Sequence, residues 1–89
     1  MEGRTVTIPN VLGLHARAAA KFVHLASTFE SRVSVRRGAR TVDGKSILGI
    51  LLLAAARGTE IVLTTDGPDA ERAIVALADF VASGFGERA

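Results

Sequence analysis

Residues 16–29, ARAAAKFVHLASTF, carry the pattern that decides the fold. Apolar side chains recur there at intervals of three and four residues, which places them on one side of a helix. This apolar stripe consists of Ala19, Phe22, Val23 and Ala26. The opposite, polar stripe consists of Arg17, Lys21, His24 and Thr28. The spacing therefore predicts a helix over 16–29 that covers a core with one of its sides.

The segments around this helix alternate between polar and apolar residues, as half-buried β-strands do. We expect four strands, at Arg4–Ile8, Ser31–Arg36, Ala39–Val42 and Glu60–Thr65. Turn-forming residues stand between them, at Arg37–Gly38 and Asp43–Gly44.

Two more helices complete the predicted order. Ser46 stands at an N-cap position, so a helix is expected over Ile47–Arg57, with Gly58 as its stop. The last helix has the apolar stripe Ala70, Ala73, Ile74, Leu77, Ala78 and Val81. The tail, Ser83–Ala89, is polar and contains glycine, and we expect it to fray.

The order strand–helix–strand–strand–helix–strand–helix predicts an α+β fold, with a four-stranded antiparallel sheet covered by helices on one face. The chain has 89 residues, which corresponds to one domain spanning 1–89. Hydrophobic residues make up 48% and charged residues 22%, as in ordinary globular proteins, so a disordered chain is not expected.

Composition also excludes several classes of function. The chain contains no cysteine, which excludes disulfides and thiol chemistry, and His15 and His24 are too far apart to form a helical metal-ligand pair. The longest apolar run, Ile47–Ala56, is too short to span a membrane. Met1–Asn10 lacks the apolar segment of a signal peptide. We therefore expect a cytoplasmic protein with no bound metal and no membrane insertion.

His15–Ala16–Arg17 is the first candidate site, because it stands at the start of the first predicted helix. The free N–H groups and the positive dipole end of a helix N-terminus bind anions. A neutral imidazole there is a nucleophile that can accept a phosphoryl group, and an arginine can hold phosphate oxygens. The alternative is an ordinary exposed histidine beside a loop.

Gly44–Lys45–Ser46 is the second candidate, although it is not a nucleotide-binding P-loop. That motif needs a glycine five residues before Gly44, and Gly38 is one residue too far. Ser46 is instead an N-cap residue and, in the sharper interpretation, a phosphorylation site. The following run, Ile47–Leu53, is more apolar than one buried side requires, so part of it is either core or a docking surface.

Four arginines form a basic cluster: Arg32, Arg36, Arg37 and Arg40. They suit either a phosphate-binding face or a solvated sheet edge. The net charge is only +2, and the chain has no Trp or Tyr on which bases could stack. We therefore expect no nucleic-acid partner, although a small nucleic-acid-binding domain stays open as a third hypothesis.

Two motifs now point to one family. Gly13–Arg17, with Ala19 and Ala20, resembles the active-site signature of HPr, the histidine-containing phosphocarrier family of the bacterial phosphotransferase system. Lys45–Ile50, KSILGI, resembles the family's second signature, around a regulatory serine. Both motifs stand in the family's order and spacing, and the resemblance covers nearly the whole chain.

The resemblance implies an open-faced β-sandwich, with the sheet order first–fourth–second–third strand and three helices on one face. His15 would take a phosphoryl group on Nδ1 from enzyme I, which phosphoenolpyruvate charges, and pass it to a histidine of an enzyme IIA. Arg17 and the backbone N–H of Ala16 would steady the phosphate. The protein would be a monomeric, stoichiometric carrier without a cofactor, and not an enzyme.

The resemblance also implies a regulatory layer. Ser46 would be the target of an HPr kinase/phosphorylase, and Ile47, Leu48 and Leu51 would dock partners. The chain departs from the family at Ala18, where proline is usual, and His24 and Ser27 replace basic residues of the docking rim. These departures fit a regulatory, nitrogen-related branch at least as well as sugar transport. The main alternative is therefore a protein-binding module controlled by phosphorylation.

Overall fold

The computed structural model describes residues 1–87. Within them the chain forms the predicted order of elements. Their bounds are β1 Glu2–Thr7, α1 Ala16–Ser27, β2 Arg32–Arg37, β3 Arg40–Asp43, α2 Ile47–Leu52, β4 Glu60–Asp66 and α3 Ala70–Ala82. The alternating and helical patterns of the sequence thus identified each element by type.

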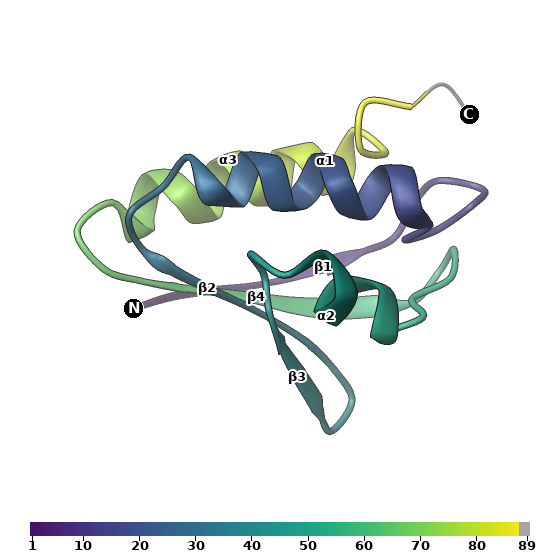
Figure 1. The fold of residues 1–89 in the computed structure, drawn as a ribbon, viewed down its shortest axis with the longest axis horizontal. Helices are drawn as coiled ribbons and strands as arrows, with labels where there is room; N and C mark the ends of the chain where they lie inside the picture. Colours follow the sequence, from purple (N-terminus) through teal and green to yellow (C-terminus); the bar gives the residue numbers. More distant parts are fainter. Residues whose placement is uncertain (88–89) are drawn as a thin grey trace.

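The strands form one antiparallel sheet in the order β1-β4-β2-β3. Figure 1 shows α1 and α3 lying beside each other over one face of this sheet, with α2 beneath α1. The predicted sheet order and the placement of three helices on one face are confirmed. In this arrangement the α1 N-terminus, the α2 segment and the last described residues after α3 gather at one end of the molecule.

The core lies between the sheet and the helices, and it follows the predicted periodicity. Alternate residues of the two central strands are fully buried, namely Val33, Val35, Ile61 and Leu63. All six predicted stripe residues of α3 are buried, and so are Ala19, Phe22 and Ala26 of α1. Val23 is half-buried, while Ala18 is completely buried, so the buried side of α1 is turned slightly from the predicted stripe.

The predicted helix over Ile47–Arg57 is wrong at its end, because α2 stops at Leu52. Leu53 is the C-cap, and Ala54 has a φ of 49°, in the left-handed region. Arginine side chains from the β2–β3 hairpin donate to the carbonyls of Leu52 and Leu53, at 2.8 and 2.7 Å. These distant groups satisfy the end of the helix, and no local pattern in the sequence encodes them.

The tail, expected to fray, is ordered as far as Glu87. Phe85 is completely buried, and its N–H donates to the carbonyl of Phe80 at 3.0 Å. The Phe85 side chain joins the core cluster that contains Leu14 and Phe22. Burial of one large aromatic side chain thus holds the segment on the core despite its polar composition. Residues 88–89 lie outside the described part of the chain.

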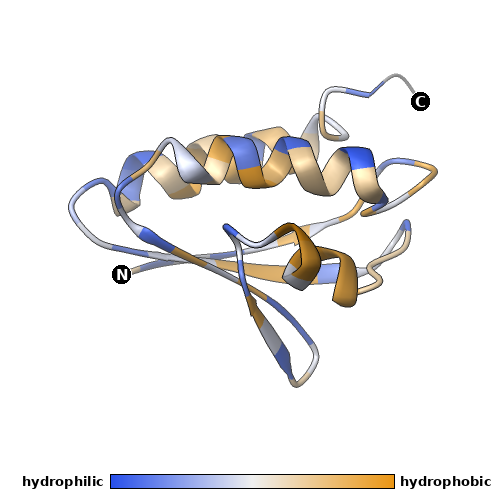
Figure 2. Cartoon of the chain, in the orientation of Figure 1, coloured by the Kyte–Doolittle hydropathy of each residue, from blue (hydrophilic) through white to orange (hydrophobic). Residues whose placement is uncertain are grey.

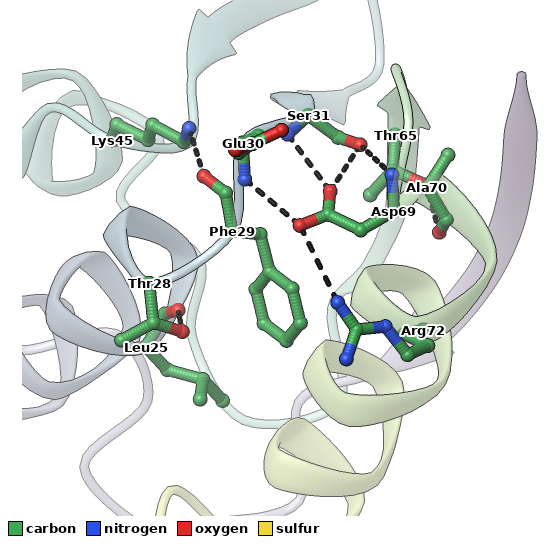
Figure 3. A network of polar contacts seen from close by, with 10 residues as sticks. All are labelled: Leu25, Thr28, Phe29, Glu30, Ser31, Lys45, Thr65, Asp69, Ala70 and Arg72. Carbon is green, nitrogen blue, oxygen red and sulfur yellow. Dashed lines mark hydrogen bonds and ion pairs between the residues drawn. The ribbon is translucent and has the colours of Figure 1, made fainter.

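Asp69, just before α3, binds the loop that leads from α1 into β2 (Figure 3). Its carboxylate accepts from the N–H groups of Glu30 and Ser31, both at 2.9 Å, and from the Ser31 hydroxyl at 2.5 Å. The Ser31 hydroxyl and the Glu30 N–H stabilise the ionised form, which lowers the pKa of Asp69 to about 2. This contact fixes the end of the molecule opposite the α1 N-terminus.

Candidate functional site

His15 is the N-cap residue of α1, as the sequence predicted. The preceding loop is held against the segment between α2 and β4. Leu14 is buried, and its N–H donates to the carbonyl of Ala55 at 2.9 Å. Gly13 has a φ of 65°, and a Cβ there would come within 2.6 Å of the same carbonyl oxygen. Glycine is therefore required at this position, and the backbone that carries His15 has little freedom.

The two ring nitrogens of His15 have different partners. Nδ1 accepts from the N–H of Arg17 at 3.3 Å, and Nε2 lies 2.5 Å from a carboxylate oxygen of Glu87. An ionised carboxylate only accepts hydrogen bonds, so Nε2 carries the ring proton. In the neutral ring, Nδ1 then keeps a lone pair that points to the N-terminus of α1.

Glu87 has a second donor, Asn10. The Asn10 side-chain amide donates to Glu87 at 2.8 Å and to the carbonyl of Gly13 at 2.9 Å. Partial burial raises the pKa of Glu87, but the hydrogen bonds from His15 and Asn10 and the charges of His15 and Lys21 outweigh it, so this pKa lies below its ordinary value. Glu87 is therefore ionised beside His15 at neutral pH.

Neither Glu87 nor Asn10 was identified from the sequence. Glu87 is 72 residues from His15, and no local spacing connects the two. The sole local signal was Phe85, a large aromatic side chain in a segment that otherwise reads as a polar tail.

Ala16 and Arg17 open α1, and both are exposed. The first N–H groups of this 12-residue helix have no carbonyl partner within the helix, and its dipole adds positive potential at the same place. The Arg17 guanidinium makes no hydrogen bond or ion pair within residues 1–87. The N–H donors and the Arg17 guanidinium can thus bind an anion beside Nδ1 of His15, the candidate nucleophile.

Ser46 is the N-cap of α2, again as predicted. Its hydroxyl oxygen accepts from the N–H of Gly49 at 3.1 Å, and the residue is half-buried. The neighbouring Lys45 reaches away from it, because its ammonium group donates to the carbonyl of Phe29 at 2.7 Å. Lys45 thus ties the start of α2 to the end of the α1 segment.

The apolar helix α2 is partly exposed, and Figure 2 shows it as one of the most hydrophobic parts of the ribbon. Ile47 is 45% exposed and Leu48 68%, whereas Leu51 is half-buried against the core. Leu52, which was not among the predicted docking residues, is 55% exposed. Two further exposed apolar residues precede His15 in its loop, Val11 and Leu12.

The arginine cluster is largely occupied by contacts within the protein. Arg37 and Arg40 donate to carbonyls at the end of α2, and Arg36 donates to the carbonyl of Gly38. These contacts favour the structural interpretation of the cluster over a nucleic-acid surface. In the described part of the chain, no group of three His, Cys, Asp or Glu side chains is placed to hold a metal ion, and no helix has the length and apolarity needed to cross a bilayer.

The comparisons with known proteins agree with this geometry. Residues 3–83 match the family model described as PTS HPr component phosphorylation site. The chain belongs to the HPr family. The phosphocarrier protein HPr of Cupriavidus necator is 51% identical over 84 residues, which is 94% of each chain. The phosphocarrier protein NPr of Shewanella violacea is 42% identical over 84 residues, 94% of this chain and 92% of the relative.

A solved structure extends the match to the whole fold. HPr-C-His from Thermoanaerobacter tengcongensis superposes with a TM-score of 0.95 at 44% identity, and the match covers both chains completely. The family resemblance drawn from the two motifs is therefore confirmed. Membership of the HPr family supports a phosphocarrier role in the phosphotransferase system.

Proposed function

We propose that His15 accepts a phosphoryl group on Nδ1 from enzyme I, charged by phosphoenolpyruvate, and passes it to a histidine of an enzyme IIA. The observation that carries this proposal is the pairing of the ring. Nε2 is held by Glu87 at 2.5 Å, while Nδ1 accepts from the N–H of Arg17 at 3.3 Å, so its lone pair points to the N-terminus of α1.

The transfer is a simple exchange of bonds at phosphorus. The Nδ1 lone pair forms a bond to phosphorus, and the bond between phosphorus and the donor breaks, with its electron pair returning to the donor. The phosphoryl oxygens then lie beside the N–H groups of Ala16 and Arg17 and within reach of the Arg17 guanidinium. Onward transfer reverses these steps at Nδ1, so the protein acts as a stoichiometric carrier and needs no cofactor.

Both partners would dock over the surface next to His15. The exposed side chains of Ile47 and Leu48 supply apolar contact, with Leu51 beneath them as partly buried support. His24 and Ser27 are exposed on α1, where the family commonly has basic residues. Association with an acidic partner should therefore depend less on charge, which fits a regulatory, nitrogen-related role as well as sugar transport. We propose that it works as a single-domain monomer in the cytoplasm.

The test is intact-protein mass spectrometry after incubation with enzyme I and phosphoenolpyruvate. We expect one added phosphoryl group, labile in mild acid, in the wild type. We expect none in His15→Ala and full addition in the control His24→Ala, because the second histidine is exposed on the side of α1. An unchanged mass in the wild type, or an acid-labile addition in His15→Ala, would overturn the proposal.

A second function is favoured by Ser46, which stands directly beside the exposed apolar surface. We propose that phosphorylation of Ser46 by an HPr kinase/phosphorylase regulates docking. A phosphate there adds up to two negative charges next to Ile47 and Leu48, which disfavours an acidic partner. In the extreme, this regulation would be the main role of the protein.

Ser46→Asp tests this second function, with Thr5→Asp as a control at an exposed position of β1. We expect Ser46→Asp to weaken binding to enzyme I several-fold in calorimetric titrations, and Thr5→Asp to bind as the wild type does. Equal affinities for all three proteins would remove the regulatory proposal and leave the carrier proposal intact.

A further inference from the structure

We propose that Glu87 is a positioning residue for phosphoryl transfer, because its carboxylate accepts the hydrogen bond from Nε2–H of His15 and so keeps Nδ1 unprotonated, with its lone pair available to phosphorus. This inference rests on the proposed role of His15. It extends the site from one helix N-terminus to a chain of three side chains, Asn10, Glu87 and His15, that come from both ends of the protein.

The C-terminal segment is built to deliver this carboxylate. After α3, Gly84, Phe85 and Gly86 all have left-handed backbone conformations, with φ values of 76°, 60° and 71°. They turn the chain back toward the start of α1. Phe85 anchors the turn, since its ring is completely buried and packs edge-on against Phe80 with 5.7 Å between the ring centres.

Asn10 fixes the orientation of the carboxylate. Its NH₂ group lies between the Gly13 carbonyl and a Glu87 oxygen, and both of these only accept hydrogen bonds. A rotated amide would place oxygen against oxygen at both contacts, so the observed orientation is the one that satisfies them. One Glu87 oxygen is thereby occupied by Asn10, and the other is directed at Nε2 of His15.

The contact also matches the charge that develops in the reaction. When Nδ1 binds phosphorus, the ring gains positive charge, and this charge is shared with the protonated Nε2. A carboxylate 2.5 Å away, with its side chain only 15% exposed, stabilises that charge in a site from which most water is excluded. When the phosphoryl group leaves, its electron pair returns to Nδ1. The proton stays on Nε2 throughout, so Glu87 neither gains nor loses an atom.

Glu87→Gln separates this role from simple attachment of the tail. The glutamine has the same length, can still accept from Asn10 and leaves Phe85 in place, but it lacks the negative charge. The matched control is Glu71→Gln, at an exposed acid of α3. We expect Glu87→Gln to accept the phosphoryl group from enzyme I about tenfold more slowly, and Glu87→Asp to recover part of the rate. Glu71→Gln should match the wild type.

NMR of the unphosphorylated protein gives a readout that tail packing alone would not change. In the wild type, the Nε2–H of His15 should give a far-downfield resonance protected from exchange with water. In Glu87→Gln this resonance should move upfield or broaden away, while the methyl resonances of the core stay in place. Equal transfer rates with an unchanged ring-proton resonance would overturn the inference, as would slow transfer with an unchanged resonance.

The two proposals fail in different ways. A wild-type protein that accepts no phosphoryl group would contradict the role of His15, and the ring-proton resonance would still report on the contact with Glu87. A wild type that accepts the group at the same rate as Glu87→Gln would leave the carrier role standing and remove the role of Glu87.

Discussion

At the scale of single residues, His15 has a structural task that competes with its proposed chemistry. Its Nδ1 caps α1 by accepting from the N–H of Arg17, and the same lone pair is the one proposed to bind phosphorus. The proposed phosphorylation would therefore remove the cap and supply phosphoryl oxygens as new acceptors at the same helix end. The N–H of Arg17 would then have an acceptor both before and after the transfer.

Asp69 offers a residue-scale prediction at the other end of the molecule. Its pKa of about 2 lies below the ordinary value of 3.8, so the folded state favours the ionised carboxylate. This stabilisation is fully present above pH 3.8 and is lost as the pH falls through about 2. Asp69→Asn should therefore unfold at lower urea concentration at neutral pH, and its difference from the wild type should shrink as the pH falls toward 2.

Urea unfolding curves between pH 7 and pH 2 measure this difference, with the exposed Asp79→Asn as a control. The asparagine also places an NH₂ group against one of the N–H groups of Glu30 and Ser31, which adds to the loss at neutral pH. A difference between Asp69→Asn and the wild type that stays constant with pH would contradict the prediction.

The residues of the site differ in how well the sequence could predict them. The placement of His15 and Arg17 at one helix end was predictable because they are two positions apart in the sequence. Glu87 and Asn10 were not, since their contact with His15 depends on where the tail returns to the fold. A contact between residues 72 positions apart leaves no periodic signal in a single sequence.

At the scale of elements, the two long helices and the central strands β2 and β4 followed from periodicity because each has one buried side. The edge strands β1 and β3 are largely exposed, and each packs one partly buried valine, Val6 or Val42, against the core. For the short helix α2 the sequence predicted the start but not the end, since its run of apolar residues continues past that end into Leu53 and Ala55, which are buried as loop residues. The end of α2 is set by Arg37 and Arg40 from the neighbouring hairpin. Tertiary contacts therefore decided the boundary that local propensity left open.

Ser46 provides the prediction at this scale, because a helix of six residues depends strongly on its cap. Ser46→Ala loses the acceptor for the Gly49 N–H and should lower the free energy of unfolding by about 1 kcal/mol. Ser46→Asp keeps a carboxylate oxygen at the cap and should stay close to the wild type. Urea unfolding of the three proteins measures both effects. Equal stability of Ser46→Ala and the wild type would show that the cap contributes little.

At the scale of the whole molecule, the last described residues complete the core and the site together. α3 crosses the sheet, and the segment after it returns over the N-terminus of α1 (Figure 1). The buried ring of Phe85 and the contact of Glu87 with His15 lie only two residues apart, so core packing and site geometry share one segment. The stability of this segment is therefore tied to the geometry around His15.

Phe85→Ala tests this connection. Removing a completely buried phenylalanine should lower the free energy of unfolding by about 3–5 kcal/mol, a large part of the roughly 4–13 kcal/mol typical of a domain of this size. It should also release Glu87, so the folded fraction should lose the protected Nε2 proton of His15 in NMR spectra at low temperature. Val75→Ala, at an exposed position of α3, is the matched control and should change neither property.

If Phe85→Ala destabilised the protein as expected but kept the protected proton, the tail would hold Glu87 without its anchor. The contact with His15 would then depend on Asn10 alone.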